Sequence, residues 1–467
     1  MSAAREHVVV VGGGFAGLLA AAAVAPYVEH VSVVERDRFP EQPALRRGVP
    51  QARHPHLFVP GGVTVAEELL PGLTQRLIRA GAHRVGMNAD LLLYSGAGGW
   101  MPRYPTSRFG LTCSRQLLDH VVYDMVRQWR NVEFRSATAA VRLLGDARAV
   151  TGVELHTPDD ETERLDASLV IDATGRGSRT VEWLASLGTT LAPPEIVDSG
   201  HTYTTREFRA LPGAETNFPM VIVQAHPASG RPEYNALLLP IEDGRWLVTV
   251  GGTRGCRLPA DEDEFREAAR RWVRAPLIGE LIADAAPLSS IQRSRSTVNR
   301  RHRFDRMREW PSGFVVIGDA ATALNPTYGH GLSAAARCAG TLRRAVARGA
   351  ARPADSRKLQ RAVTGAANYP WLTAIGQDLH YPNTTGARPR WVDRVGKRYG
   401  DRLLRAAPER PQLGTRLIEV MFLAQSPLLL AHPAVLSGVV RRPRCAPPTE
   451  PPLAPGERGL LAGRQVG

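Results

Sequence analysis

A glycine-rich turn near the start of the chain has the residue types needed to bind a pyrophosphate. The run GGGFAG, which begins at Gly12, has the spacing G-x-G-x-x-G. We expect Gly12 to permit a tight turn, Gly14 to let a pyrophosphate approach the backbone, and Gly17 to let a helix pack closely. Phe15 and Ala16 open that helix, whose first N–H groups and positive dipole end favour phosphates. The turn therefore predicts a dinucleotide site.

Two strands and a helix must position this turn. The valine run at 8–11 is typical of a strand that is covered on both faces of a parallel sheet. A helical run at 18–24 follows the turn, and the next strand, at 31–34, ends at Glu35, with Arg36 beside it. The Glu35 carboxylate is placed to accept both ribose hydroxyls of an adenosine and would repel a 2′-phosphate. We therefore expect NADP to be excluded here, whereas the motif does not separate FAD from NAD.

A second strand–turn–helix pattern lies far downstream. The apolar run at 314–317 leads into GDAATALNPTYGHG (318–331), and a helical run at 332–336 leaves it. Gly, Pro, Asn and Asp are the residues of turns and of backbone close to a ligand. Between the two patterns, VIDATG at 170–175 is a third strand leading into a turn. A surface loop that joins a strand to a helix is the alternative interpretation of 318–331.

The composition is that of an ordinary globular chain with a basic surface. The 467 residues are 43% hydrophobic and 22% charged, with a formal net charge of +14 and a pI near 10.3. Lysine occurs only as Lys358 and Lys397, so arginine, spread along the chain, carries nearly all the basicity. We expect no nucleic-acid binding, because there is no long basic block. A cationic surface that attracts anionic substrates or cofactors is the expected consequence.

Other features exclude several classes of site. The four cysteines form no C-x-x-C pair, so neither a zinc site nor a disulfide framework is expected. His54 and His56 have no third ligand nearby, and we predict no metal. The first residues lead directly into a strand without a signal peptide, and the apolar stretch 417–440 is interrupted by Pro, Glu and His. These features predict a cytoplasmic protein with no membrane span.

The three strand–turn segments, in this order, resemble the FAD-dependent monooxygenases related to p-hydroxybenzoate hydroxylase. The resemblance implies FAD, because one turn can hold only the ADP half of that cofactor. It implies that Asp319 accepts hydrogen bonds from the ribityl chain, that Pro326 lies beside the isoalloxazine, and that Asp172 belongs to the cofactor site. Gly329, His330, Gly331 and Leu332 would begin a helix aimed at the N1–C2=O edge of the flavin. Such a helix stabilises the reduced flavin by roughly 0.3–1 kcal/mol.

Longer stretches resemble one branch of that class, the bacterial flavin-dependent epoxidases and hydroxylases of natural-product pathways, such as the monensin and lasalocid epoxidases. These stretches are RRGVPQARHPH (46–56), SRQLLDHVV (114–122), DATGRGSRTVEWLASLG (172–188), PIEDGRWLVTVGG (240–252) and NYPWLTAIGQDLHYP (368–382). The resemblance implies that Arg115 meets the flavin's phosphate or ribityl region. It also implies a mobile loop, with Arg46, Arg47 and Gln51, near the pyrophosphate and flavin; Arg47 is the residue we predict there as a cofactor ligand.

The chain departs from this branch in two motifs. His330 and Leu332 stand where the branch usually has Gln and Met, and Leu324 stands where Phe usually precedes Asn-Pro. We expect cofactor binding to survive, because Gly329 and Gly331 remain. His330 either replaces Gln as a polar spacer or hydrogen-bonds the flavin or the substrate, which makes it the one candidate catalytic residue. The choice between epoxidation and hydroxylation stays open.

The resemblance implies an α/β (α+β composite) chain in which domains are interleaved. A Rossmann-like FAD-binding domain takes 1–187 and 300–347, with part of 74–110 contributing to the substrate side. A β-sheet substrate domain takes 188–299, where strand-like runs at 220–224, 236–239 and 246–250 are joined in part by the hairpin signal EDG at 242–244. A helical region over 348–440 and a disordered tail over 441–467 complete the chain.

The expected reaction is the insertion of one oxygen atom from O₂ into a hydrophobic natural-product intermediate through a flavin C4a-hydroperoxide. NAD(P)H would reduce the FAD by transient docking, or a separate flavin reductase would supply reduced flavin. A phenol would need a general base, which the sequence does not identify. The alternatives are an alkene reductase of the geranylgeranyl-reductase type and a non-redox flavin cyclase. A halogenase would need a chamber lysine and a W-x-W-x-I-P stretch, and a GDI-like lipid carrier would lose the flavin clamp.

Overall fold

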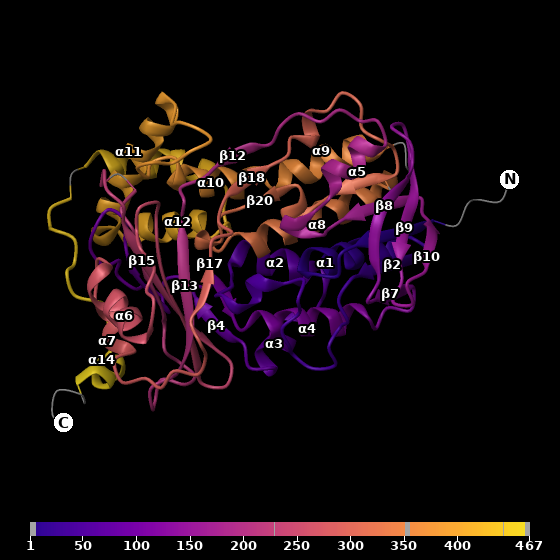
Figure 1. Cartoon of the computed structure of the whole chain (residues 1–467). Helices are drawn as coiled ribbons and strands as arrows, with labels where there is room; N and C mark the ends of the chain where they lie inside the picture. Colours follow the sequence, from indigo (N-terminus) through magenta and orange to yellow (C-terminus); the bar gives the residue numbers. More distant parts are fainter. Residues whose placement is uncertain (1–5, 228, 351–354, 442, 463–467) are drawn as a thin grey trace.

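A computed structural model describes residues 6–227, 229–350, 355–441 and 443–462 of the chain. In these residues the strands form two large sheets and three small ones. The architecture is mixed α/β, with the first large sheet at one end of the molecule and the second near the other (Figure 1).

The first large sheet is parallel throughout, in the order β19-β11-β1-β2-β7. Its strands are β1 (His7–Val11), β2 (His30–Glu35), β7 (Val132–Ser136), β11 (Leu169–Asp172) and β19 (Phe314–Val316). Val8 and Val10 pack toward a helical layer, whereas Val9 and Val11 pack toward an antiparallel sheet and its neighbours. The unbroken valine run of β1 follows from this two-sided burial, because both side-chain directions of a strand are then apolar.

Helices cover one face of this sheet and a small antiparallel sheet covers the other. The helices are α1 (Phe15–Val24), α2 (Pro60–Leu69), α3 (Leu73–Arg79), α4 (Arg115–Val126), α8 (Gly331–Ala345) and α9 (Ser356–Ala366). The opposite layer contains β8 (Ala139–Gly145), β9 (Val150–His156), β10 (Thr162–Asp166) and α5 (Thr180–Ser186). Figure 1 shows α1 and α2 beside α8.

The order of the parallel strands brings the three turn segments together. β1 pairs with β11, and β11 pairs with β19, although these strands are far apart in the sequence. Because parallel strands end at the same edge of a sheet, the turns after all three strands lie at one edge. This edge is where ligands bind in open α/β sheets.

The second large sheet has the order β17-β13-β16-β15-β14-β5. Its strands are β5 (Leu91–Tyr94), β13 (Thr202–Arg209), β14 (Met220–Val223), β15 (Tyr234–Ile241), β16 (Arg245–Gly252) and β17 (Gln292–Ser294). Asp243 and Gly244 both have φ of 61°, which is the left-handed conformation that the tight hairpin between β15 and β16 requires. β5 lies within the segment 74–110 and pairs in parallel with β14, which places this segment in the second sheet.

The two faces of this sheet have different partners. The outer face packs against α6 (Glu262–Glu267), α7 (Leu277–Leu281) and the residues between them. The inner face packs against the C-terminal helices α11 (Trp391–Ala406), α12 (Pro411–Met421) and α13 (Pro433–Val440), together with residues from β3 (Leu57–Phe58). In Figure 1 these helices lie beside α10 (Asn368–Asp378).

Two small sheets connect the large ones. β3 pairs with β6 (Phe109–Thr112), which pairs with β4 (His83–Gly86). β12 (Glu195–Val197) pairs with β18 (Asn299–Arg301), which pairs with β20 (Thr322–Ala323). We call residues 318–331 the late turn. β20 follows β19 in the chain, so the second of these small sheets holds the start of the late turn.

The expectation of a disordered tail is wrong for residues 443–462. This segment contacts Trp100 and Arg103 and ends in α14 (Pro455–Ala462). The Trp100 N–H donates to the Pro448 carbonyl at 2.8 Å, and Arg103 donates to both Glu457 carboxylate oxygens at 2.9 and 2.6 Å. Leu453 is buried in the core between the outer face of the second large sheet and helices α6 and α7. The proline-rich composition suggested disorder. An extended segment, which we call the strap, needs few apolar residues to be ordered when its carbonyls and one carboxylate accept hydrogen bonds from the rest of the chain.

Within the described ranges, no helix has both the length and the apolar character needed to cross a bilayer.

Candidate functional site

The first turn leaves an open space beside its middle glycine. Gly12 has φ of +100°, and a Cβ there would lie 2.8 Å from the Ala173 carbonyl oxygen. A Cβ on Gly17 would lie 1.8 Å from the Gly12 carbonyl oxygen, so only glycine permits this contact between turn and helix. A Cβ on Gly14, by contrast, would meet nothing within 4 Å. The turn is therefore packed on the protein side and open on the side that a pyrophosphate would occupy.

The helix that follows the turn contacts the late turn. Phe15 is buried and meets Phe58 edge to face, with 5.4 Å between ring centroids. A Cβ on Gly318 would lie 3.0 Å from the Ala16 Cβ. Phe15 thus anchors the start of α1 in the core, and Ala16 is where the first and late turns meet.

Glu35 holds the turn as well as facing the expected ribose position. Its carboxylate accepts a hydrogen bond from the Gly13 N–H at 2.7 Å and one from the Asp37 N–H at 2.9 Å. Each carboxylate oxygen can accept two hydrogen bonds, and because Oε2 also faces the Arg46 guanidinium, Oε1 is the oxygen that keeps a position for a hydroxyl. The sequence predicts Glu35 as a ribose ligand but does not show that the same side chain fixes the Gly13 amide.

Arg46, and not Arg47, lies at the first turn. The Arg46 guanidinium donates to the Gly13 carbonyl at 3.1 Å and lies 3.4 Å from a Glu35 carboxylate oxygen and 3.6 Å from one of Asp119. Its Nη1 atom is buried and has no hydrogen-bond partner. Arg47 is exposed, so the geometry favours Arg46 as a cofactor ligand, and the role of Arg47 stays a prediction. Arg36 is also exposed.

Asp172 supports the site through the turn that follows β11. Its fully buried carboxylate accepts hydrogen bonds from the Thr174 N–H at 2.8 Å, the Thr174 hydroxyl at 2.6 Å, the Ser178 hydroxyl at 2.5 Å and the Thr180 hydroxyl. Four donors use the accepting capacity of a carboxylate. We therefore assign Asp172 a positioning role, which corrects the expectation of a direct cofactor ligand.

Asp319 lies at the start of the late turn among three arginines. Its carboxylate is 3.6 Å from the Arg176 guanidinium, and its side chain is 36% exposed. Burial in the protein raises the pKa of Asp319, and the positive charges of Arg176, Arg115 and Arg300 oppose that rise. Unlike Asp172, this carboxylate retains positions for hydroxyl donors. The predicted roles of Asp319 and Arg115 fit this arrangement.

Arg115 and Arg176 reach this place from different elements. Arg115, the first residue of α4, is buried and donates to Asp119 at 2.7 Å. Arg176 lies in the turn that follows β11, which we call the middle turn. It donates to the Val298 carbonyl at 3.0 Å and to the Leu324 carbonyl. Arg176 thus joins the middle turn to the late one. The sequence showed it only as part of a motif, because its partners are carbonyls that no residue pattern reveals.

The late turn ends in the helix α8, whose N-terminus is open. Pro326 begins a short 3₁₀ turn, and Gly329 ends it with φ of +68°. A Cβ on Gly331 would meet nothing within 4 Å. Leu332, however, is buried in the helical core beneath the parallel sheet, so only its backbone faces the turn. Leu324 packs with Trp371 and Ala374 of α10, which explains why an aliphatic residue suits this position.

His330 connects the late turn to the C-terminal helices. Its Nε2 lies 3.0 Å from the Met421 carbonyl oxygen and must donate, so Nδ1 carries no proton in the neutral ring. The Nδ1 atom is buried and has no hydrogen-bond partner. Burial lowers the pKa of His330 to about 4, opposed by the hydrogen bond to Met421. His330 is therefore neutral near pH 7, with one free acceptor.

A buried carboxylate that the sequence did not reveal holds the late turn in place. Asp378, the last residue of α10, is fully buried. It accepts hydrogen bonds from the Asn299 amide at 2.6 Å, the Asn325 amide at 3.0 Å and the Tyr328 hydroxyl at 2.5 Å. Burial raises the pKa of Asp378, and these hydrogen bonds oppose the rise. In the sequence, Asp378 was distinguished only by its place in the stretch NYPWLTAIGQDLHYP (368–382).

Polar side chains gather where the loop at 46–56 meets the inner face of the second sheet. The His54 Nδ1 lies 2.9 Å from the Thr205 hydroxyl, and its ring meets Tyr203 edge to face at 4.8 Å. His201 is a buried neighbour of Tyr203. Burial lowers the pKa of both His54 and His201 to about 4. Burial also raises the pKa of Tyr203. No sequence spacing linked the loop to β13.

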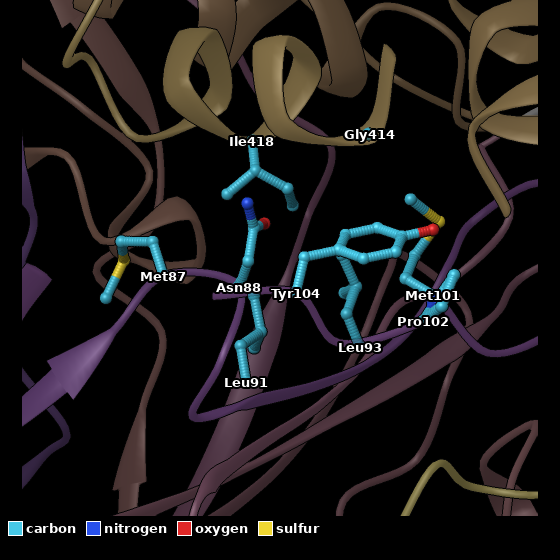
Figure 2. A pocket seen from close by; sticks show the side chains of 9 residues that line it. All are labelled: Met87, Asn88, Leu91, Leu93, Met101, Pro102, Tyr104, Gly414 and Ile418. Carbon is cyan, nitrogen blue, oxygen red and sulfur yellow. The ribbon is translucent and has the colours of Figure 1, made fainter. Parts of the chain in front are cut away.

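A small pocket separates β5 from α12. Its lining residues are shown in Figure 2 and include Leu91, Leu93 and Tyr104 on one side and Gly414 and Ile418 of α12 on the other. Its volume of about 10 Å³ is room for roughly one water molecule. The pocket therefore marks the seam between sheet and helix and is too small to hold a substrate.

The residues at this edge fit FAD. Gly14 and Gly331 leave space at two turns, while Asp319 keeps accepting positions among three arginines. Arg46 Nη1 is a buried donor that forms an ion pair with Glu35 but has no hydrogen-bond partner, and His330 Nδ1 is a buried acceptor without a hydrogen-bond partner. One open turn suits a pyrophosphate, and the second suits the remainder of an extended cofactor.

The sequence family agrees with this site. Residues 7–186 match the family model described as FAD dependent oxidoreductase. Over these residues the chain belongs to the FAD-dependent oxidoreductases. It belongs to the same family as Protein Rv3254 of Mycobacterium tuberculosis (strain ATCC 25618 / H37Rv), to which it is 32% identical over 421 residues, 88% of each chain.

Solved structures share the fold but carry out different reactions. p-Nitrophenol 4-monooxygenase PnpA from Pseudomonas putida DLL-E4 is 19% identical, with a TM-score of 0.60 over 90% of this chain and 98% of that one. The Diels-Alderase PyrE3 of pyrroindomycin biosynthesis is 20% identical, with a TM-score of 0.58 over 90% of this chain and 80% of that one. At these identities the likeness shows the fold alone, so the reaction has to be argued from the site.

Proposed function

We propose that this chain is a FAD-dependent monooxygenase that inserts one oxygen atom from O₂ into a hydrophobic natural-product intermediate by epoxidation or hydroxylation. The observation that carries the proposal is that Leu57 of β3 lies between the late turn and the covered inner face of the second sheet. A Cβ on Gly329 would lie 3.6 Å from the Leu57 Cβ, and Leu57 packs in the same cluster as Leu239 and Leu247 of that face. A flavin held by the late turn would border an apolar interior.

When bound, FAD supplies two-electron redox chemistry and the activation of O₂. The chain's own residues bind and orient it. Asp319 offers acceptors for hydroxyl groups, and the Arg115 and Arg176 side chains balance its charge. The open N-terminus of α8 directs a partial positive charge toward the site, which favours the anionic reduced form by roughly 0.3–1 kcal/mol.

Exclusion of water is the second task that the structure supports. The inner face carries Ile222 and Leu237, and the helices above it contribute Met421. All three are apolar and only partly buried by their neighbours. An apolar, covered site protects a reactive oxygen donor from hydrolysis. The same side chains support a hydrophobic substrate, and the half-buried Tyr369 and Tyr399 extend this surface.

The two lysines speak against a halogenase. The Lys358 side chain is 84% exposed and lies 3.2 Å from Asp355. Lys397 forms an ion pair with Asp401 within α11. Both ammonium groups therefore have carboxylate partners away from the late turn, and neither is placed to carry a halogen species.

The reductant in this proposal is NADH or NADPH docking transiently, or a separate flavin reductase. The Glu35 carboxylate at the first turn suits the unphosphorylated ribose of FAD, so the nicotinamide cofactor would bind elsewhere. Two other reactions remain as outcomes of the test. An alkene reductase would transfer hydride from reduced flavin, and a cyclase would use the flavin without a redox step.

The experiment is anaerobic reduction of the FAD-loaded chain followed by mixing with O₂ in a stopped-flow spectrometer. NADH, NADPH and dithionite serve as separate reductants. We expect reduction by at least dithionite and fast reoxidation by O₂, with an absorption transient between the reduced and oxidised spectra. A reduced flavin that persists in O₂ would contradict the monooxygenase and support the reductase or the cyclase.

A further inference from the structure

The strongly exposed apolar side chains gather on the C-terminal helices. Trp391 is 73% exposed, Leu428 is 79% and Val440 is 81%. Val395 and Leu436 are also exposed. We call these five residues the apolar edge. Isolated exposed apolar residues are ordinary, but several on neighbouring elements mark an interaction surface.

Helix α11 combines part of this edge with arginines. Trp391 and Val395 are four residues apart, and Arg394, Arg398 and Arg402 follow at spacings of three or four, so all lie on one side of the helix. All five are exposed. On the other side, Leu403 is buried and Gly400 and Leu404 are half-buried. α11 is thus an amphipathic helix whose outward side is both basic and apolar.

The elements that carry the apolar edge are held firmly together. The Tyr399 hydroxyl donates to the Leu430 carbonyl at 2.5 Å, which joins α11 to the segment before α13. Arg410 donates to the Gly438 carbonyl and, at 3.1 Å, to the Arg441 carbonyl, which joins the start of α12 to the end of α13. Val435 and Val439 anchor the inner side of α13. The outward apolar residues therefore belong to a fixed platform.

This part of the sequence also concentrates positive charge. Residues 386–444 contain 12 Lys and Arg against 4 Asp and Glu, a net of +8 out of +14 for the whole chain. An excess of this size in about an eighth of the chain attracts an anionic surface.

We propose that the outer surface of α11–α13 binds an anionic lipid bilayer. Arginines beside an interfacial tryptophan and aliphatic side chains are the features that place a helix in the headgroup region of a membrane. A nucleic acid would use the arginines but would leave Leu428 and Val440 in water. Lipid, by contrast, accounts for the charge and the apolar edge together.

The position of this surface suits the proposed function. α11 and α12 cover the inner face of the second sheet, so the same helices would separate the bilayer from the substrate side. A hydrophobic substrate would then have a short path from lipid to the site. This consequence rests on the monooxygenase proposal, whereas membrane binding itself does not.

The test is co-sedimentation of the FAD-loaded full chain with vesicles. One set contains phosphatidylcholine with phosphatidylglycerol, and the other contains phosphatidylcholine alone. We expect at least about tenfold stronger binding to the anionic vesicles. Trp391 emission should shift to shorter wavelength on binding, which a comparison with Trp391→Phe isolates from the other tryptophans.

Two variants separate apolar insertion from charge. Trp391→Ser with Leu428→Ser leaves the charge unchanged and should weaken binding about tenfold. Arg394→Glu with Arg398→Glu should abolish it. The matched control, Arg164→Glu with Arg308→Glu, changes the net charge equally at exposed positions on the FAD-binding side and should retain binding. FAD content and thermal unfolding of each variant show that it is folded.

Several results would overturn the proposal. Equal loss in the control variant would show attraction by net charge alone. Equal binding to a duplex DNA oligonucleotide that is lost in the same arginine variant would show a nucleic-acid surface. A dimer in sedimentation that dissociates on Trp391→Ser would show that a second copy covers the apolar edge. FAD reoxidation kinetics would be unaffected by any of these results, so the two proposals fail independently.

Discussion

His330 donates a hydrogen bond from Nε2 to the Met421 carbonyl, 3.0 Å away, and so ties the late turn to the last residue of α12. The carbonyls at the end of a helix lack intrahelical partners, and a histidine supplies one here. The bond fixes the tautomer and leaves Nδ1 as an acceptor within the site. One side chain therefore couples the late turn to the helices that cover the inner face of the second sheet.

This arrangement predicts a pH dependence of stability. The pKa of His330 is about 4 in the folded chain, as are those of His54 and His201, against about 6.5 when unfolded. Because the folded pKa values are depressed, the unfolded chain binds more protons between pH 6.5 and 4, and stability is lost as the pH falls through that window. For His330 alone the loss is about 2 kcal/mol at pH 5.

Urea unfolding between pH 7.5 and about 4.5 measures this effect. His330→Gln keeps a donor for Met421 but cannot be protonated, so its free energy of unfolding should fall less steeply with pH than that of the wild type. An identical slope for the two proteins would contradict the assignment of a buried neutral His330.

Arg46 and Arg47 form a natural matched pair. Arg46→Ala removes a guanidinium that contacts the Gly13 carbonyl and has a buried Nη1 without a hydrogen-bond partner, so we expect FAD to dissociate about tenfold more readily. Arg47→Ala changes an exposed residue and should leave the dissociation constant unchanged. Titration of apoprotein with FAD, followed by flavin fluorescence, distinguishes the two. The opposite ranking would restore Arg47 as the ligand.

Asp319 and Asp172 should respond differently to the same substitution. Asp319→Ala removes open acceptors and should raise the FAD dissociation constant about 10–100-fold, with little change in apoprotein stability. Asp172→Ala strands buried hydroxyl and amide donors and should lower the free energy of unfolding by about 2–4 kcal/mol. FAD titration and urea unfolding of both apoproteins check this. A large stability loss in Asp319→Ala would show that its role is structural.

The order of the three turns could be predicted from the sequence, whereas much of what fixes them could not. β1 and β19 were recognisable because strands covered on both faces are continuously apolar. The glycine spacing likewise located the open turns. The Asp378 cluster escaped notice because its partners, Asn299 and Asn325, come from separate elements and follow no period.

The remaining differences between the sequence-based predictions and the structure have the same physical origin. Arg46 and Arg47 are adjacent and identical in type, so only the direction of each side chain separates them. The strap at 443–462 has the composition of a disordered tail, and its order depends on Trp100 and Arg103, which lie far away in the sequence. Contacts that join distant segments through single side chains are not visible in local patterns.

Asp378 should be a major source of stability for the late turn. Asp378→Ala would leave the Asn299, Asn325 and Tyr328 donors without their acceptor in a buried place, at a cost of about 3–5 kcal/mol. Tyr328→Phe removes one donor and should cost about 1 kcal/mol. The control Asp160→Asn changes a carboxylate that is 93% exposed and should be neutral. Unfolding by urea ranks the three variants, and a near-neutral Asp378→Ala would refute this role.

The central claim is that the two turns form one FAD site used for oxygen transfer, and oxygen consumption tests it most directly. The FAD-loaded chain is reduced anaerobically and injected into an oxygen electrode, with catalase added afterwards to reveal peroxide. The account predicts that bound reduced flavin consumes O₂ and, without substrate, returns part of it as peroxide. A chain that takes up no FAD, or whose bound reduced flavin consumes no O₂, would contradict it.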